Sequence, residues 1–168
     1  MINRMQFLAG DLSGEREPLR PPWALPEGHF VDQCIRCGDC VKACGDGLIQ
    51  IGRGGYPRMD FTAGGCDFCR SCVEACKPRA LDQARIEDAP PWRLGARILD
   101  SCLSLGGVVC RACAEVCDPR AIVFRPQVGG VSVPLLDRAS CTGCGACFPV
   151  CPVNAVRIYP KAPHDQAA

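Results

Sequence analysis

Short apolar runs separated by turn residues recur along the chain. The clearest are residues 121–124 (Ala-Ile-Val-Phe) and 155–158 (Ala-Val-Arg-Ile), with a weaker copy at 48–51. Apolar runs bounded by glycine or proline predict short strands. Residues 55–60 and 130–137, which precede the second and fourth of the cysteine groups described next, also predict extended chain. No apolar run approaches the ~20 residues that a membrane span requires.

The residues between these predicted strands are dominated by cysteine. The chain contains 16 cysteines in four groups of four. Three groups have the spacing C-x2-C-x2-C-x3-C, and the third is stretched to C-x7-C-x2-C-x3-C. This spacing is typical of bacterial ferredoxins that bind [4Fe-4S] clusters. The four groups therefore predict four [4Fe-4S] clusters and a protein that carries or manages electrons.

The spacing has a physical reason. Three cysteines two residues apart wrap a tight loop around one cluster, and backbone N–H groups of the loop point at its sulfur atoms. The fourth cysteine is expected to begin a short helix and to reach the neighbouring cluster. The predicted ligand sets are Cys34, Cys37, Cys40 and Cys76 (first set); Cys66, Cys69, Cys72 and Cys44 (second set); Cys102, Cys110, Cys113 and Cys151 (third set); and Cys141, Cys144, Cys147 and Cys117 (fourth set).

A longer repeat indicates how the groups pair. Pro21-Pro22-Trp23 precedes the first group and Pro90-Pro91-Trp92 precedes the third, 69 residues later, while the first cysteines of these groups lie 68 residues apart. Because the two offsets agree, we prefer a duplication over chance recurrence of a tripeptide. A duplication argues against pairing the second group with the third. The tryptophans are expected to cap cluster surfaces or the contact between the halves.

Each repeat is expected to run strand, cluster loop, short helix, strand, which is a ferredoxin-like arrangement. The predicted fold class is α+β, with two tandem bacterial-type 2[4Fe-4S] ferredoxin-like units and a core dominated by cofactors. The predicted divisions are an N-terminal arm (1–28), the first unit (29–81), a connector (82–98), the second unit (99–159) and a flexible tail (160–168).

Other uses of the cysteines fit the spacing less well. Structural zinc usually takes two C-x2-C pairs separated by a longer loop. Disulfide-rich secreted domains do not repeat one spacing four times, and residues 1–10 have no long apolar stretch and no twin arginine. The third group leaves two alternatives open. Either Cys102 is a ligand and the long loop alters solvent access at its cluster, or Cys102 is unused and a three-iron cluster forms.

Charge and composition limit the partners. The formal net charge is +1, but four oxidised clusters at about −2 each would lower the charge of the loaded protein to about −7. An acidic protein argues against a nucleic-acid partner. Since the cysteines account for much of the apolar content, folding is expected to depend on cluster loading, with apo protein largely unfolded or aggregated. Assembly in the reducing cytoplasm is the expectation.

No other catalytic group is apparent. The histidines are His29 and His164; neither has a serine or a free cysteine as a partner, so structural or exposed roles are expected and the protein is predicted not to be an enzyme. The stretch Gly52-Arg53-Gly54-Gly55 predicts a turn and not a phosphate cradle. The leading arm is mildly basic, which fits a solvated arm or a docking segment. Its arginines are Arg4, Arg16 and Arg20.

Several stretches taken together resemble one family. They are the leading segment 3–10, the Arg20-Pro21-Pro22-Trp23 box, the stretched third group, and residues 54–57, 121–126 and 141–147. Over about residues 3–158 the chain resembles the NapF family, the ferredoxin-type accessory proteins of the periplasmic nitrate reductase system. The resemblance implies that the sixteen cysteines are the functional residues. The departures are small: the arm has no adjacent arginine pair, and no proline follows the first group.

The resemblance also implies a location and a partner. NapF-like proteins are cytoplasmic and associate with the molybdenum-containing catalytic subunit of the nitrate reductase before its export. They help to mature its iron–sulfur centre or set its redox state. Two other hypotheses remain open. One is an electron-transfer subunit of another respiratory oxidoreductase complex, and the other is a scaffold whose clusters are purely structural.

Overall fold

The computed structural model describes residues 18–161, so residues 1–17 and 162–168 lie outside the described part. The expectations for most of the leading arm and for most of the tail fall on those residues. They include Arg4, Arg16 and His164.

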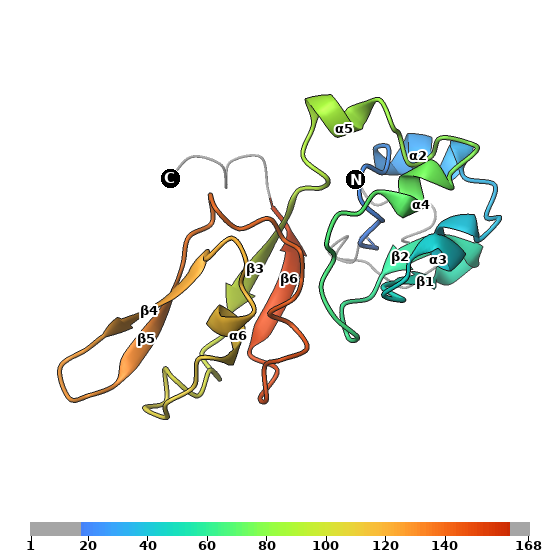
Figure 1. Ribbon diagram of the computed structural model, residues 1–168. Helices are drawn as coiled ribbons and strands as arrows, with labels where there is room; N and C mark the ends of the chain where they lie inside the picture. Colours follow the sequence, from blue (N-terminus) through green and yellow to red (C-terminus); the bar gives the residue numbers. More distant parts are fainter. Residues whose placement is uncertain (1–17, 162–168) are drawn as a thin grey trace.

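The described chain forms two lobes joined by residues 90–93 (Figure 1). The N-terminal lobe comprises residues 18–89 and the C-terminal lobe residues 94–161. The N-terminal lobe contains α2 (Glu27–Gln33), α3 (Asp39–Ala43), β1 (Ile49–Ile51), the 3-10 turn η1 (Arg53–Gly55), β2 (Pro57–Met59), α4 (Ser71–Glu74) and α5 (Arg85–Asp88). Strands β1 and β2 pair antiparallel, with Ile49 opposite Met59.

The C-terminal lobe is built on two antiparallel strand pairs. Its elements are β3 (Leu94–Ile98), α6 (Ala112–Glu115), β4 (Ile122–Pro126), β5 (Ser132–Leu136) and β6 (Val156–Pro160). Strand β4 pairs with β5, with Ile122 opposite Leu136. Strand β3 pairs with β6, with Leu94 opposite Pro160. The mixture of short helices and short strands confirms the predicted α+β class.

The strand pairs follow the fourfold repeat of the sequence. Beside the three sheets, Ala24 and Leu81 form an isolated antiparallel bridge. This bridge occupies the place in the N-terminal lobe that the longer β3–β6 pair occupies in the C-terminal lobe. In both cases the chain leaving the last cysteine of a lobe pairs with the chain that enters the lobe.

Every repeat turns in the same way after its fourth cysteine. The carbonyl of that cysteine accepts a hydrogen bond from the N–H three residues later, at 2.8–3.1 Å. The donating residue has a left-handed backbone in each repeat, with φ between 50° and 66°. These residues are Gly47, Arg79, Arg120 and Asn154. A local turn, repeated four times, therefore sends each chain into its strand.

The helices differ in position from the expectation that they begin at the fourth cysteine. Helices α3, α4 and α6 instead contain the third cysteine and end before the fourth. In α3 the following residue, Cys44, is already extended, with φ −80° and ψ 98°. The fourth cysteine must leave the helix because its thiol has to point toward the other loop.

The fourth repeat has no helix at all among its described residues, only turns over residues 146–150. The sequence explains this difference. Pro149 disfavours a helical backbone at Phe148 and has no N–H to donate. The prediction of a short helix in every repeat was therefore wrong for this one.

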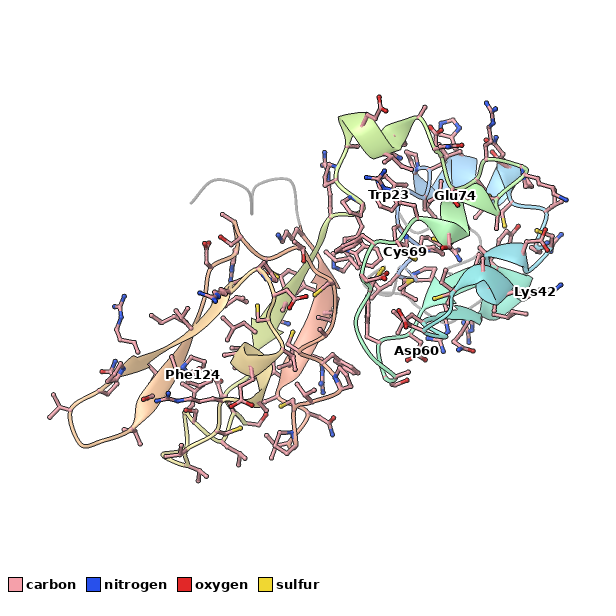
Figure 2. All side chains as sticks on the ribbon, in the orientation of Figure 1. Trp23, Lys42, Asp60, Cys69, Glu74 and Phe124 are labelled. Atoms are coloured by element: carbon pink, nitrogen blue, oxygen red, sulfur yellow. The ribbon has the colours of Figure 1, made fainter. Side chains whose placement is uncertain are left out.

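The apolar core is unequally divided between the lobes. The larger cluster lies mainly in the N-terminal lobe, reaches Leu94 of β3, and includes Trp23, Phe30, Leu48, Met59, Phe61 and Leu81. The smaller cluster lies in the C-terminal lobe and consists of Ala96, Ile122, Cys147 and Val156, with partly buried neighbours. Figure 2 shows Trp23 within the N-terminal lobe and Phe124 on the β4–β5 side of the C-terminal lobe.

Part of the predicted arm belongs to the core. Pro21, Pro22 and Trp23 are buried. The Arg20 side chain is only 13% exposed and forms two hydrogen bonds with the Glu27 carboxylate, at 2.6 and 2.8 Å. Arg20 is therefore a packed residue and not part of a solvated arm. The predicted connector likewise includes a strand, β3. The remaining boundaries stay predictions.

Both tryptophans lie where the lobes meet. The Phe68 ring lies between them, 6.4 Å from Trp23 and 5.3 Å from Trp92 between ring centroids. The backbone N–H of Trp23 donates to the carbonyl of Pro91 at 2.6 Å. The two Pro-Pro-Trp segments thus contact each other directly, which confirms the expected packing role of the tryptophans at the contact between the halves.

Candidate functional site

The cysteines of the N-terminal lobe gather around two centres. Burial raises the pKa of the Cys40 thiol to about 11, and the nearby thiols of Cys76, Cys34 and Cys37 raise it as well. The structure therefore brings Cys76, from the second group, to the three leading cysteines of the first group. These four cysteines are the predicted first set.

The second centre of this lobe is the reciprocal arrangement. Burial raises the pKa of Cys72 to about 12 and that of Cys66 to about 11. The thiols of Cys44 and Cys69 act on both of them. Cys44, from the first group, thus joins three cysteines of the second group, as in the predicted second set.

The C-terminal lobe repeats this exchange of fourth cysteines. Burial raises the pKa of Cys113 to about 11, with Cys102, Cys110 and Cys151 as its thiol neighbours. Burial raises the pKa of Cys147 to about 12, and its thiol neighbours are Cys144, Cys141, Cys113 and Cys117. The structure places Cys102 with the third set despite the stretched loop.

The raised pKa values have a chemical consequence. Without a cation these buried thiols are neutral at pH 7, because burial penalises the thiolate. Iron binds thiolates, so loading must release protons, and the attraction of the metal has to outweigh the burial penalty. Holding four thiols together in a poorly solvated place is therefore costly for the apo chain and favourable for a chain that binds metal.

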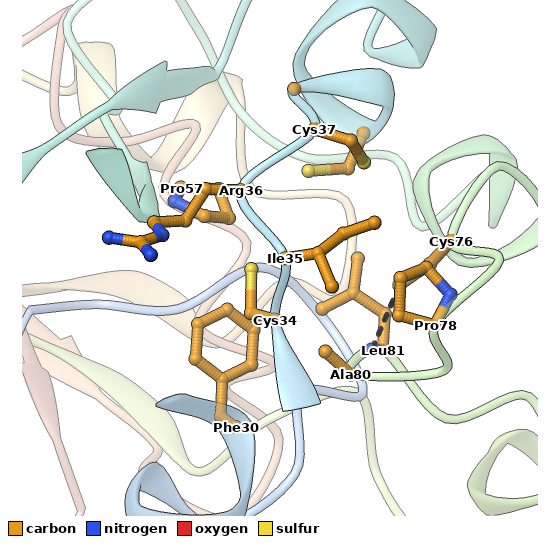
Figure 3. Close-up of a pocket in the computed structure, with 12 residues that line it drawn as sticks. Phe30, Cys34, Ile35, Arg36, Cys37, Pro57, Cys76, Pro78, Ala80 and Leu81 are labelled. Atoms are coloured by element: carbon orange, nitrogen blue, oxygen red, sulfur yellow. Dashed lines mark hydrogen bonds between the residues drawn. The ribbon is translucent and has the colours of Figure 1, made fainter. Parts of the chain in front are cut away.

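Two of the sets line cavities. Cys34, Cys37, Cys40 and Cys76 line a hollow together with apolar side chains, including Phe30, Ile35 and Leu81 (Figure 3). Cys102, Cys110, Cys113 and Cys151 line a second hollow with Ile98, Phe124 and Val156. In both lobes the equivalent set faces a small hollow with apolar walls.

Backbone N–H groups support the sulfur atoms of both cavities. The N–H of Leu81 donates to Sγ of Cys76 at 3.3 Å, drawn as a dashed line in Figure 3. The N–H of Ala155 donates to Sγ of Cys151 at 3.1 Å. Hydrogen bonds to cluster sulfurs are one of the means by which proteins set a reduction potential. Both donors follow the last cysteine group of their lobe, Leu81 five residues after Cys76 and Ala155 four residues after Cys151.

The loops around three of the sets share an unusual backbone. The second and fourth residues after the first cysteine are left-handed in groups one, two and four, with φ from 60° to 84°. Alternation of left-handed with other conformations turns successive N–H groups toward one side, which favours a bound anion. These residues are Arg36 and Gly38, Phe68 and Arg70, and Gly143 and Gly145. The loops therefore fit an anionic cluster.

The third group departs from this pattern. Arg111 follows Cys110 with φ −134°, where the other groups have a left-handed residue. The inserted residues form turns of their own, with the N–H of Gly106 donating to the carbonyl of Cys102 at 3.1 Å. The stretched loop thus keeps Cys102 beside its set but surrounds it with a different backbone.

Within residues 18–161, no three Cys, His, Asp or Glu side chains converge closely enough to hold one ion. Thiolates are the ligands that iron–sulfur clusters take, and a cubane would offer each of four thiolates its own iron.

The remaining expectations concern groups outside the sets. His29 is exposed on α2. The glycine-rich stretch is the turn η1 between β1 and β2, as predicted. In the described residues no helix has the length and apolar character needed to cross a membrane.

The sequence did not indicate two aspartates that hold turns just before the second and fourth cysteine groups. Asp60 accepts hydrogen bonds from the hydroxyl and N–H of Thr62, at 2.7 and 3.1 Å. Asp137 accepts from the hydroxyl of Ser140 and the N–H of Ala139. An aspartate followed two or three residues later by Thr or Ser is the available signal for such a turn.

Lys161 was also missed, because the sequence placed it in a flexible tail. Its ammonium donates to the carbonyls of Cys141 and Arg138, at 2.8 and 2.9 Å. It therefore lies beside the fourth cysteine group and fixes the first turn of that loop.

Comparison with protein families agrees with the geometry. Residues 27–81 and residues 108–155 each match a 4Fe-4S dicluster domain. Two dicluster domains and sixteen cysteines fit four [4Fe-4S] clusters, as expected. The second match begins inside the stretched loop, after Cys102.

Comparison with individual proteins gives matches over most of the chain. The chain is 41% identical over 154 residues to the ferredoxin-type protein NapF of Escherichia coli K12, which covers 92% of each chain. It is 42% identical to NapF of Haemophilus influenzae, covering 94% of this chain and 93% of the relative. A more distant relative is the methylamine utilization ferredoxin-type protein MauM of Paracoccus denitrificans, with 36% identity over 85% of this chain and 71% of the relative.

Proposed function

We propose that this chain, which belongs to the NapF family of ferredoxin-type proteins, assists maturation of the catalytic subunit of periplasmic nitrate reductase in the cytoplasm before export. The observation that carries the proposal is the identity of 41–42% to NapF proteins over more than nine tenths of both chains. In this role the chain loads the iron–sulfur centre of the subunit or conditions its redox state.

The residues proposed to hold the four clusters are the four cysteine sets. The first and second sets bind two clusters in the N-terminal lobe, and the third and fourth sets bind two in the C-terminal lobe. When bound, a [4Fe-4S] cluster accepts and releases one electron at a time. The surrounding residues exclude water from one side of each hollow and donate N–H groups to cysteine sulfur.

Exposed thiols support an exchange with a partner protein. Cys37 of the first set and Cys69 of the second set are both exposed. A cluster bound to an exposed cysteine has one edge close to the protein surface. Electron exchange with a docked subunit, or handover of cluster material, needs such an edge.

The proposal is tested by capture of the precursor. The tagged full-length chain is expressed in anaerobic cells that make the periplasmic nitrate reductase, and bound proteins are probed for the catalytic subunit with its export signal. We expect recovery of the precursor and not of the exported form. A preparation that holds its full iron content but recovers no precursor would remove the maturation role.

A second readout separates maturation from simple association. In cells that lack the chain, the catalytic subunit is purified from the cytoplasm and its iron–sulfur signal is measured by EPR per molecule of subunit. A maturation role predicts a lower signal, which returns when the chain is supplied. An unchanged signal with normal precursor capture would leave association without maturation.

The second candidate function is an electron-transfer subunit of another respiratory oxidoreductase complex. The similarity to MauM favours keeping it, since that protein is named for methylamine utilization. The capture experiment distinguishes the two, because an electron-transfer subunit would be recovered with a different, assembled complex. Redox titration tests a purely structural role, which predicts clusters that accept no electrons at accessible potentials.

A further inference from the structure

The two lobes meet through their cysteine loops. The N–H of Cys66 donates a hydrogen bond of 2.8 Å to the carbonyl of Cys144. Cys66 belongs to the second set and Cys144 to the fourth set, so the bond joins one candidate ligand directly to another across the lobe boundary. In Figure 2, Cys69 of the same loop lies on the side of the N-terminal lobe that faces the C-terminal lobe.

Glycines allow this close approach. A β-carbon at Gly65 would lie 2.6 Å from Cβ of Ala146 and 2.7 Å from its backbone nitrogen. A β-carbon at Gly145 would collide with the ring of Phe61. At Gly143 it would come within 2.5 Å of the carbonyl oxygen of Leu94. These three glycines therefore leave no room for a β-carbon where the cysteine loops pack against Ala146, Phe61 and Leu94.

Aromatic residues hold the loops in this position. Trp92 packs edge-to-face against Phe61 at 5.8 Å and against Phe68 at 5.3 Å. The indole N–H of Trp92 donates to the carbonyl of Thr142 at 2.9 Å. Trp92 thus contacts the loop of the second group through its ring and the loop of the fourth group through its nitrogen.

Inside each lobe the two sets approach each other through thiols and not through a backbone hydrogen bond. The Cys40 thiol of the first set lies near enough to Cys72 of the second set to raise its pKa. In the C-terminal lobe, Cys113 of the third set is likewise a neighbour of Cys147 of the fourth set. Each lobe therefore has its own internal link through the two third cysteines, and the Cys66–Cys144 bond connects the two linked pairs.

We propose that the contact between Cys66 and Cys144 is the electron-transfer junction of the molecule, and that the sites are ordered first, second, fourth, third. The proposal rests on the cluster ligands assigned under the proposed function. The first and third sets then form the two ends of the path, and each of them lines a hollow in its own lobe.

The cysteine sets would hold clusters that each supply one-electron chemistry. A one-electron donor protein would be oxidised at one end of the path, and an oxidised iron–sulfur partner would be reduced at the other. No bond would form or break and no proton would be needed, so what the two loops have to supply is a short, fixed contact at Cys66 and Cys144.

Two neighbouring glycines provide a matched test. A side chain at Gly65 must displace the backbone of Ala146, whereas a β-carbon at Gly64 meets nothing within 4 Å. Gly65→Val is expected to separate the loops, and Gly64→Val is the control. Fully reduced holoprotein is examined by EPR, in which neighbouring reduced clusters broaden each other's signals.

The expected result is specific to one variant. Wild type and Gly64→Val should show the same coupled spectrum, and Gly65→Val should lose the inter-lobe part of the coupling while keeping about sixteen irons per chain. The proposal is overturned if Gly65→Val keeps its iron and the wild-type spectrum, or if Gly64→Val changes the spectrum as much.

Hydrogen exchange on the unaltered holoprotein covers the case in which Gly65→Val fails to fold. The amide of Cys66 should exchange at least 100-fold more slowly than a free amide, and exchange at the free rate would overturn the junction. Neither measurement involves nitrate reductase. A protein that shows the coupled spectrum but captures no precursor would therefore contradict the proposed function and leave the junction intact.

Discussion

The two lobes hold equivalent sets of thiols by different means. The N-terminal lobe surrounds its sets with an aromatic and aliphatic core, and the one sheet within residues 18–89 has strands of three residues. The C-terminal lobe has a small core but two antiparallel strand pairs with five residues in each strand. The same cysteine exchange can therefore be supported by side-chain burial or by backbone pairing.

The loops around the third and first sets sharpen the contrast. In the N-terminal lobe, α2 lies between the entering chain and Cys34. In the C-terminal lobe the extra residues lie within the cysteine group, where the hydroxyl of Ser104 bonds to the carbonyl of Ser132 and Val109 is 81% exposed. The additional residues of the N-terminal lobe form α2, which contributes Phe30 to the core. Those of the C-terminal lobe form a loop that reaches solvent at Val109.

The largest expected effect comes from removing iron. Chelation under anaerobic conditions should abolish hydrogen-exchange protection throughout the C-terminal lobe, because its small core does not offset the cost of ordering the chain. The N-terminal lobe should retain some protection around Phe30 and Leu81. Equal protection in both apo lobes would contradict the comparison.

Substitution of one ligand in each lobe tests the equivalence of the sets. Cys34→Ser and Cys102→Ser should each lower the iron content from about sixteen to about twelve per chain if a whole cluster is lost. Iron and acid-labile sulfide analysis measures this. If Cys102→Ser keeps all its iron, the third set does not use Cys102.

Truncation of core side chains compares the two kinds of support. Phe30 is fully buried, so Phe30→Ala should lower the free energy of unfolding of the N-terminal lobe by about 3–5 kcal/mol. Phe124 is only partly buried on β4, so Phe124→Ala should cost the C-terminal lobe about 1 kcal/mol. Hydrogen exchange resolved by lobe measures both changes, and equal losses would argue against unequal cores.

The Arg20 contact has no counterpart in the C-terminal lobe, where Ala89 precedes the second Pro-Pro-Trp segment. Arg20→Ala should lower the stability of the N-terminal lobe by about 2 kcal/mol, because it removes charge-assisted hydrogen bonds to Glu27. Arg58→Ala is the control. Its ion pair with Asp60 is exposed and should contribute less than about 0.5 kcal/mol. Denaturant titration of the holoprotein compares the two.

The smallest effect concerns pH. Hydrogen bonds from the Thr62 side chain and backbone lower the pKa of Asp60 below its ordinary 3.8. A lowered folded-state pKa gives a stabilisation that is complete above the unfolded pKa and is lost as the pH falls through the folded pKa. Stability of wild type relative to Asp60→Asn should therefore decline as the pH is lowered from 6 toward about 3. A constant difference would show that the turn does not depend on the charge.

The sequence was sufficient for the features that depend on local spacing. The spacing predicts that Cys44 and Cys76 are exchanged between groups, and the structure places each of them beside cysteines of the other group. The cluster that each cysteine binds stays a prediction. The turn at Gly52–Gly55 followed from composition in the same way. Helix position did not follow, because a four-residue helix is set by the loop it joins and has little propensity of its own.

Features that depend on packing between lobes could not be predicted. The tryptophans indicated that a contact exists, but not that Cys66 bonds to Cys144. That bond arises from glycines that look like ordinary loop residues until the opposite loop is in place. Arg20 was misjudged for a related reason, since its partner Glu27 and the carbonyl of Pro57 come near it only in the fold.

The distribution of exposed thiols has a consequence for how the protein reacts with oxidants. Cys37 and Cys69 are the two exposed cysteines among the sixteen, and both lie in the N-terminal lobe. Dioxygen and peroxide would therefore reach that lobe first. The N-terminal lobe, which has the larger apolar core, would then lose its clusters first. Brief exposure to air should bleach this lobe while its chain stays folded.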